Sequence, residues 1–157
     1  MTTYFGSDIH LGHENVISFC NRPFKDLEEM EEDFFNEILG KCRDEDEIYL
    51  LGDIVFNQSK RILDQLNEYD LNIHLIIGNH DTQKVINHPV WKSVSYLKEI
   101  SIPEVDLPIV LCHYPIESWN KKRYGSIHLH GHTHNNISND LTTIPNRLDV
   151  GYDSTKQ

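Results

Sequence analysis

Short apolar runs, each about the length of a β-strand, recur along the whole chain. Apolar or alternating segments bounded by turn-forming residues are typical of strands. We expect eight strands, at residues 2–7, 48–51, 72–77, 94–96, 99–102, 109–112, 127–130 and 147–150. Segments with helical periodicity lie only between the first three of these strands. The pattern therefore predicts βαβαβ followed mainly by β-structure joined by turns.

Two longer helices are expected between the first three strands. Asp26 is suited to cap a helix that reaches about Cys42, with apolar residues at helical spacing and acidic residues on its outer face. A second helix is expected over residues 59–69, and a shorter one after a loop within residues 11–20. Together these elements predict an α/β fold in which two sheets pack in a single domain over residues 1–157.

The composition is that of a globular domain with an acidic balance. The 157 residues are 38% hydrophobic and 25% charged, which suffices for a core without disulfides. The net charge of −11 argues against broad electrostatic adhesion to nucleic acid or to an anionic membrane. Two divalent cations would offset four of these charges and make one face locally positive, so a phosphate substrate is not excluded.

Cysteine usage and hydropathy bear on the cellular location. Cys20, Cys42 and Cys112 show no CxxC spacing, and their odd number suggests neither a disulfide framework nor a zinc knuckle. The first residues have no signal-peptide pattern, and no apolar run is long enough to cross a bilayer. We therefore expect a cytoplasmic protein that does not act at a membrane, and the oligomeric state stays open.

Residues that can bind metal follow most of the apolar runs, and ten histidines are a high count for this length. The run at 72–77 ends in Gly78, which we expect to allow a sharp turn, and continues with Asn79, His80 and Asp81. Ligands of open α/β sheets collect at such carboxyl ends, and amide, imidazole and carboxylate groups can hold a cation. Taken alone, this tetrapeptide is equally typical of a polar turn.

The other strand ends decide between these interpretations. Asp8 and His10 follow the first strand, and alternate positions of extended backbone project to one side, where both can bind the same ion. The full set of strand-end candidates is Asp8, His10, Asp53, Asn79, His80, His113, His132 and His134. Because each follows an apolar run, we expect all of them to meet at one rim.

The ordered motifs Asp-x-His, Gly-Asp, Gly-Asn-His-Asp, His and Gly-His-x-His closely resemble those of the calcineurin-like metallophosphoesterase superfamily. The match runs from Asp8 to His134. The segments at 8–15, 21–24 and 113–115 are similar to those of small bacterial and phage phosphoesterases. The resemblance implies a four-layer αββα sandwich, with two mixed β-sheets flanked by helices, and a binuclear metal-dependent phosphoric ester hydrolase.

The resemblance also implies a ligand set for two divalent metal ions. One ion would be held by Asp8, His10 and His134, the other by Asn79, His113 and His132, and the Asp53 carboxylate would bridge them. These mixed donors suit Mn²⁺, which we expect, and also Fe²⁺, Zn²⁺, Ni²⁺ or Co²⁺, better than Ca²⁺. In the superfamily's pattern two such metals activate a water that attacks phosphorus.

Further roles follow for residues around these ligands. His80 would contact the phosphoryl or leaving-group oxygen and donate a proton to it, and Asp81 would orient the His80 imidazole. His13 and Arg22 are candidate substrate contacts, weighed against a plain loop histidine and a surface arginine paired with the acidic helix. His128 and His130 share a strand face, and one of them is expected to pack beneath the site.

The substrate class is only partly constrained by the sequence. No long insertion leaves room for a cap domain, so an open site acting on a phosphodiester or a small nucleotide-like substrate is favoured. A nuclease acting on DNA or RNA is the alternative, and it would need a basic groove, for which residues 121–123 are the only basic run. A catalytically silent scaffold is a further alternative, but it predicts broken ligand positions, and none is broken.

Overall fold

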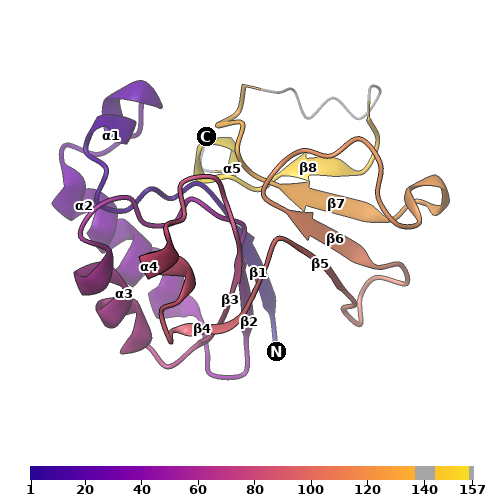
Figure 1. The fold of residues 1–157 in the computed structure, drawn as a ribbon, viewed down its shortest axis with the longest axis horizontal. Coiled ribbons are helices and arrows are strands. Elements are labelled where there is room, and N and C mark those ends of the chain that lie inside the picture. Colours follow the sequence, from indigo (N-terminus) through magenta and orange to yellow (C-terminus); the bar gives the residue numbers. More distant parts are fainter. Residues whose placement is uncertain (137–143, 156–157) are drawn as a thin grey trace.

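The computed structural model describes residues 1–136 and 144–155 as an α/β fold with two four-stranded sheets (Figure 1). The first sheet has the order β1 (Thr3–Gly6), β2 (Glu47–Leu50), β3 (Asn72–Ile76) and β4 (Trp91–Ser95). The second has the order β5 (Leu97–Ile100), β6 (Ile109–Cys112), β7 (Ile127–His130) and β8 (Arg147–Asp149). All eight expected strands are therefore present, with shifts of up to three residues at their ends.

The sheets differ from the expected two mixed sheets. Every neighbouring pair in the first sheet is parallel, so this sheet is not mixed. In the second sheet β5 and β6 are antiparallel, whereas β6, β7 and β8 are parallel to one another. The parallel pairs β3–β4 and β6–β7 are possible because their connections are long. Residues 77–90 and residues 113–126 each suffice for a crossover that brings the chain back to the start of a parallel strand. The strands after residue 90 are thus not a simple series joined by turns.

The helices lie between the strands of the first sheet and at the end of the described chain. They are α1 (Asn15–Phe19), α2 (Leu27–Glu32), α3 (Ser59–Asn67), α4 (Gln83–Ile86) and α5 (Tyr152–Thr155). The last two were not predicted, because a single turn shows no periodicity. No helix within the described ranges has the length and apolar character that a membrane span requires.

The expected helix over residues 26–42 is one continuous helical segment whose winding changes along its length. After α2 it continues as a π-helical stretch, η1 (Asp33–Ile38), and ends as a 3-10 turn, η2 (Leu39–Lys41). The Asp26 side chain caps its start by accepting a hydrogen bond from the Glu29 backbone N–H at 3.0 Å, as the sequence predicted.

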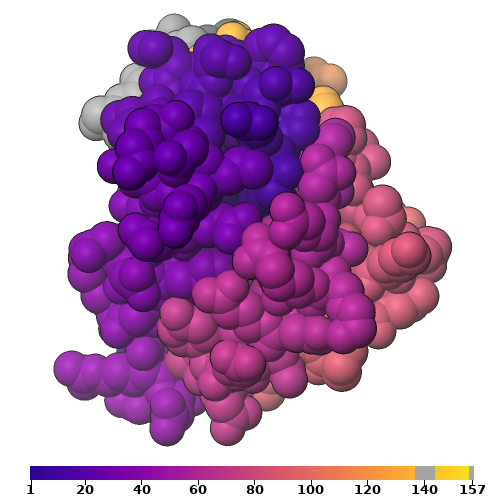
Figure 2. All heavy atoms as spheres, turned by 90° about the vertical axis from the view of Figure 1, so that its left-hand side faces the viewer, coloured from indigo at the N-terminus to yellow at the C-terminus, as the bar shows by residue number. Residues whose placement is uncertain are grey.

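Two cores hold the layers together. The helices cover one face of the first sheet, with Phe34, Leu63 and Leu75 in the core between them, and Figure 2 shows these helical segments on the surface in purple and magenta. The second core lies between the two sheets and includes Leu51 and Leu111. Alternate residues of β2 and β3 therefore face the two cores, as the two-residue period of a strand requires.

The expected αββα sandwich has a layer of helices on the outer face of each sheet. In the described part of the chain, no layer of α-helices covers the outer face of the second sheet. The outer face of the second sheet contacts the segment 114–126, which contains one 3-10 turn, η3 (Lys122–Tyr124). The Trp119 ring lies 5.2 Å from that of His128 on β7, and the Ile116 backbone N–H donates to His128 Nε2 at 3.2 Å. The connection from β6 to β7 has only fourteen residues, 113–126, and covers this face without a longer helix.

Candidate metal centre

The residues after the carboxyl ends of strands from both sheets meet in one place. Backbone hydrogen bonds join the connecting loops: the N–H of Asp8 donates to Gly52 O, and the N–H of His10 to Asp53 O, both at 3.0 Å. On the other sheet the Gly131 N–H donates to His113 O at 2.9 Å. The seven side chains named as ligands from the sequence are consequently gathered at a common rim, where they form two groups.

The first group consists of Asp8, His10 and His134, whose ligand atoms lie within 4.8 Å of one another. Asp8 Oδ1 is 4.0 Å from His10 Nε2 and 3.8 Å from His134 Nε2. Asp8 Oδ1 and both ring nitrogens of His10 are buried and have no hydrogen-bond partner among the described residues. Buried polar atoms normally have partners, so this donor set fits a bound divalent cation.

The second group is built on the Asn79 side-chain oxygen. Asn79 Oδ1 lies 3.0 Å from His113 Nε2 and 3.1 Å from His132 Nδ1. An amide oxygen and two imidazole nitrogens that converge in this way are suitable ligands for the same borderline cations.

Asp53 lies between the two groups. Its Oδ2 is 3.8 Å from His10 Nε2 in the first group and 3.6 Å from His113 Nε2 in the second. Its Oδ1 accepts the backbone N–H of His80 at 2.9 Å, which holds the carboxylate in this orientation. The position is the one that a bridging ligand would occupy.

Hydrogen bonds behind the ligands fix which ring nitrogens face the centre. His113 Nδ1 lies 2.6 Å from Leu51 O, and His134 Nδ1 lies 2.7 Å from Asp153 Oδ2. An N–H donated at Nδ1 leaves the lone pair on Nε2 directed into the site, as is usual for metal-binding histidines. Asp153 was not found from the sequence, because it follows His134 by nineteen positions in a turn of helix with no motif of its own.

Arg22 does not contact the open site, contrary to both sequence interpretations. Its guanidinium is buried and forms two bonds with the Asp153 carboxylate, at 2.8 and 3.0 Å, and lies over the Tyr152 ring at 4.6 Å. It also donates to the backbone oxygens of Asp8 and Ile9, each at 2.6 Å. The N–H groups of Arg22 thus hold the loop after β1 and α5 together. They are not free to bind a phosphate, and they are not paired with a carboxylate of the acidic helix.

Replacing Arg22 should reduce stability markedly. Arg22→Ala removes the group that binds both oxygens of the buried Asp153 carboxylate and leaves this carboxylate only the contact with His134, and breaking a buried pair on one side costs about 3–5 kcal/mol. Urea denaturation measures this loss. Arg61→Ala is the matched control, because the Arg61–Glu31 pair is half-exposed and surface pairs contribute only about 0–1 kcal/mol. Equal losses in the two variants would contradict the structural role of Arg22.

Asp81 acts on the backbone and not on the His80 imidazole. Its carboxylate accepts backbone N–H groups of Gly78 at 2.7 Å, Asp53 at 3.1 Å and Ile54 at 3.4 Å. The expectation that it orients the imidazole is therefore corrected: it fixes the loop that carries Asn79 and His80. The His80 side chain is exposed, with its ring 5.9 Å from that of His10.

The backbone of the ligands is strained. Asp8, His10, Asp53, His132 and His134 all have positive φ, between 46° and 72°. Non-glycine residues adopt this left-handed region at a cost, and such strain concentrates at functional sites. Asp8 and His10 were expected in extended backbone, and that prediction was wrong, although both side chains do reach the same group.

Two glycines allow the close packing around the carboxylates. A Cβ at Gly78 would overlap Asp53 Oδ1, and a Cβ at Gly131 would overlap Ser7 Oγ and Asp8 Oδ2. Gly78 does not have a positive φ, so close approach and not a sharp turn explains why glycine fits there.

Gly131→Ala should weaken metal binding in the first group. The added methyl must displace the Asp8 carboxylate, so we expect Mn²⁺ affinity at that group to fall by about 10–100-fold, the size of losses when ligand support is disturbed. Titration followed by electron paramagnetic resonance measures it. Gly40→Ala is the control, since its Cβ would meet only Phe35 O at 3.5 Å. Unchanged affinity in Gly131→Ala would count against Asp8 as a ligand.

Burial changes the protonation of the metal-free ligands. It raises the pKa of Asp8 to about 6, an effect that the nearby His113 and His134 partly offset. It lowers the pKa of His10 to about 3, and the charges of His134 and Arg22 add to this. His10 is therefore a neutral imidazole at neutral pH, which is the form that binds a metal.

The remaining histidines lie at different distances from the centre. His13 is beside it, with its ring 5.9 Å from that of His10 and 4.2 Å from that of Phe56. His128 and His130 are fully buried on β7, where His128 Nδ1 lies 3.0 Å from Val110 O and His130 Nδ1 lies 2.8 Å from Gly131 O. His130 thus supports the chain segment that leads to His132, as expected for one of this pair.

No family model matches the chain. The chain is similar to the uncharacterized protein MJ1445 of Methanocaldococcus jannaschii, with 32% identity over 154 residues that cover 94% of this chain and 78% of that protein. It is also 29% identical over 182 residues to the Gene 66 protein of Mycobacterium phage D29, covering 96% of this chain and 87% of the phage protein.

A solved structure shows the same fold. The protein of unknown function AQ665 from Aquifex aeolicus has a TM-score of 0.77 and 22% identity, covering 98% of this chain and 91% of that one. The nuclease MPE of Pseudomonas putida reaches a TM-score of 0.48 with 20% identity, over 83% of this chain and 60% of that one, a likeness too low to bear on function. Because its sequence matches over nearly the whole length of this chain, the chain belongs to the same family as the M. jannaschii protein MJ1445.

Proposed function

We propose that this protein is a binuclear metal-dependent phosphoesterase of the calcineurin-like superfamily, acting on phosphomono- or phosphodiester bonds of a small or nucleotide-like substrate. The observation that carries the proposal is the position of Asp53. Its Oδ2 lies within 4 Å of an imidazole nitrogen from each donor group, which supports a carboxylate shared by two proposed ligand sets. Seven donors that meet from five separate loops are hard to explain by packing alone.

The unpartnered polar atoms support occupation of the first group. Asp8 Oδ1 and His10 Nε2 are buried without hydrogen-bond partners in the described residues, and a cation would satisfy both. Mn²⁺ is the ion we propose, with Fe²⁺, Zn²⁺, Ni²⁺ and Co²⁺ also suited to these donors. The chemistry that two bound cations supply is the acidification of a water molecule and the neutralisation of phosphoryl charge.

The side chains of the protein would then perform the remaining steps. The exposed His80 imidazole lies above the first group and, when protonated, donates a proton to the departing ester oxygen. Asp81 holds the His80 backbone through the N–H groups of Gly78 and Asp53. His13, whose buried Nδ1 has no partner among the described residues, lies where it would contact a phosphoryl oxygen.

A panel of substrates tests the proposal. The Mn²⁺-loaded protein should hydrolyse para-nitrophenyl phosphate, its bis-ester or a cyclic nucleotide, and chelation followed by gel filtration should abolish the activity until Mn²⁺ is restored. Single-stranded DNA distinguishes the nuclease alternative. A protein that binds two metals and hydrolyses none of these compounds would instead be a catalytically silent scaffold, and the proposal would be wrong.

A further inference from the structure

Two exposed aromatic rings flank the candidate metal centre, one beside each ligand group. Phe56 is 39% exposed and Tyr114 is 41% exposed, which leaves part of each ring open to solvent. The Phe56 ring lies 5.4 Å from that of His80 and 6.0 Å from that of His10. The Tyr114 ring lies 5.0 Å from that of His113 and 4.9 Å from that of His132. One ring therefore lies beside each of the two ligand groups.

These rings would have different partners in a phosphodiester. His80 is the proposed proton donor to the leaving oxygen. Because Phe56 neighbours His80, we assign Phe56 to the leaving-group side. The Tyr114 ring lies against the imidazoles of His113 and His132 in the second group, so we assign it to the ester group that stays on phosphorus.

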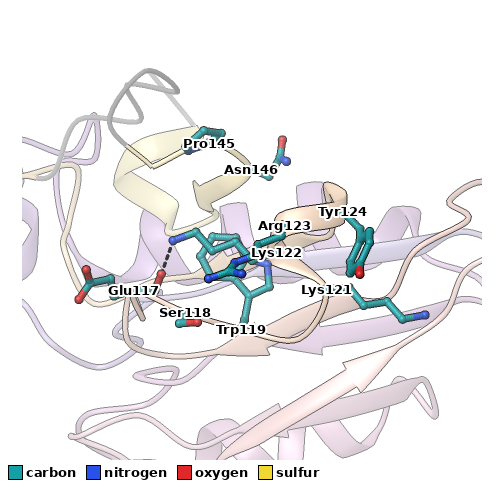
Figure 3. A pocket seen from close by; sticks show the side chains of 9 residues that line it. All are labelled: Glu117, Ser118, Trp119, Lys121, Lys122, Arg123, Tyr124, Pro145 and Asn146. Atoms are coloured by element: carbon teal, nitrogen blue, oxygen red, sulfur yellow. Dashed lines mark hydrogen bonds between the residues drawn. The ribbon is translucent and has the colours of Figure 1, made fainter.

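The charges of the chain argue against a long nucleic acid. The net charge is −11, and the run Lys121 to Arg123 lines a groove of ≈ 730 Å³ with Trp119 and Asn146 (Figure 3). This groove lies at the start of β7 and β8, whereas the metal centre is at their carboxyl ends, about 13 Å away for a four-residue strand. In Figure 3 Lys122 is folded back, with its ammonium over the Trp119 ring and bonded to the Glu117 carbonyl. Among the residues that the structure describes, the run Lys121 to Arg123 therefore offers a polyanion no basic track to the centre.

A nucleoside is an ester group that an exposed aromatic ring can bind without a basic track. Bases stack on aromatic side chains with little dependence on their identity, because every base has a π-face. We infer that the substrate is a small nucleoside phosphodiester whose retained base stacks on Tyr114. This inference rests on the proposed phosphoesterase function and adds its substrate class and a residue that determines specificity.

The test compares two diesters that share a leaving group, thymidine 5′-(para-nitrophenyl phosphate) and methyl para-nitrophenyl phosphate. We expect the Mn²⁺-loaded protein to have a kcat/KM about 10-fold or more higher for the thymidine ester, mainly through a lower KM. Tyr114→Ala should bring the ratio of the two kcat/KM values close to one, and Tyr114→Phe should restore it. Tyr124→Ala is the matched control, because Tyr124 is 80% exposed beside the distant groove, and it should keep the wild-type ratio.

The outcomes separate this inference from the function on which it rests. Hydrolysis of both esters with equal kcat/KM would overturn the nucleoside inference and leave the phosphoesterase function standing. A preference for the thymidine ester that survives in Tyr114→Ala would overturn the role of Tyr114. Hydrolysis of para-nitrophenyl phosphate but of neither diester would overturn the inference and leave the phosphoesterase function standing, whereas hydrolysis of none of the three compounds would overturn both.

Discussion

Asp53→Asn should abolish catalysis and reduce metal binding at both ligand groups. The Asp53 carboxylate faces His10 on one side and His113 on the other, so its neutralisation removes negative charge from two sites at once. Removing a partner of a ligand costs about 10–100-fold in metal affinity, and the loss of a direct ligand to two ions should reach at least the upper end of that range. Elemental analysis of the dialysed protein should give fewer than two equivalents of metal.

Asp46→Asn is the matched control for this variant. Asp46 is also a buried carboxylate, but it lies at the opposite end of β2, where it accepts backbone N–H groups of Thr2 at 2.6 Å and Arg43 at 2.9 Å. Its substitution should cost stability while two metals remain bound. Two full equivalents in Asp53→Asn would show that the carboxylate does not bridge.

His80→Ala should separate catalysis from metal binding. The imidazole is exposed and takes no part in either donor group, so the metal content should stay at two equivalents. Loss of a general acid lowers turnover by about 10²–10⁴-fold, and we expect a decrease in kcat of this size. Steady-state kinetics of the metal-loaded variant on a cyclic nucleotide, whose leaving group is an alkoxide that needs a proton, measures it.

The leaving group offers a second measurement on the same variant. A general acid matters most for a poor leaving group, so the defect of His80→Ala should grow as the pKa of the departing alcohol rises. His88→Ala is the control, since His88 lies 3.0 Å from the Asp64 carboxylate and belongs to neither donor group. Loss of one metal equivalent in His80→Ala would instead identify His80 as a ligand.

The pattern of apolar runs was sufficient to predict the strands and the convergence of the ligands. The runs before His113 and His132 coincide with β6 and β7 at both ends, because each is continuously apolar on its core-facing positions and stops at a polar turn. Parallel strands deliver their carboxyl ends to one edge, so residues far apart in sequence, such as Asp8 and His132, could be placed together in advance.

Other features depend on contacts that no local pattern encodes. The pairing of Arg22 with Asp153 joins residues 131 positions apart, and neither lies in a recognisable motif with the other. Asp81 follows His80 directly, which suggested a link between their side chains, but the turn directs the carboxylate into the backbone of the neighbouring loop. The left-handed backbone at Asp8 and His10 likewise accompanies the hydrogen bonds to Gly52 and Asp53, which belong to the loop after β2.

The location of bound metal tests the central claim most directly. Crystals of the Mn²⁺-loaded protein should give two anomalous difference peaks on either side of Asp53, separated by ~3.5–4 Å as in two-metal sites. One peak should contact Asp8, His10 and His134, and the other Asn79, His113 and His132. A single peak, or peaks that do not contact Asp53, would contradict the binuclear centre and the phosphoesterase function built on it.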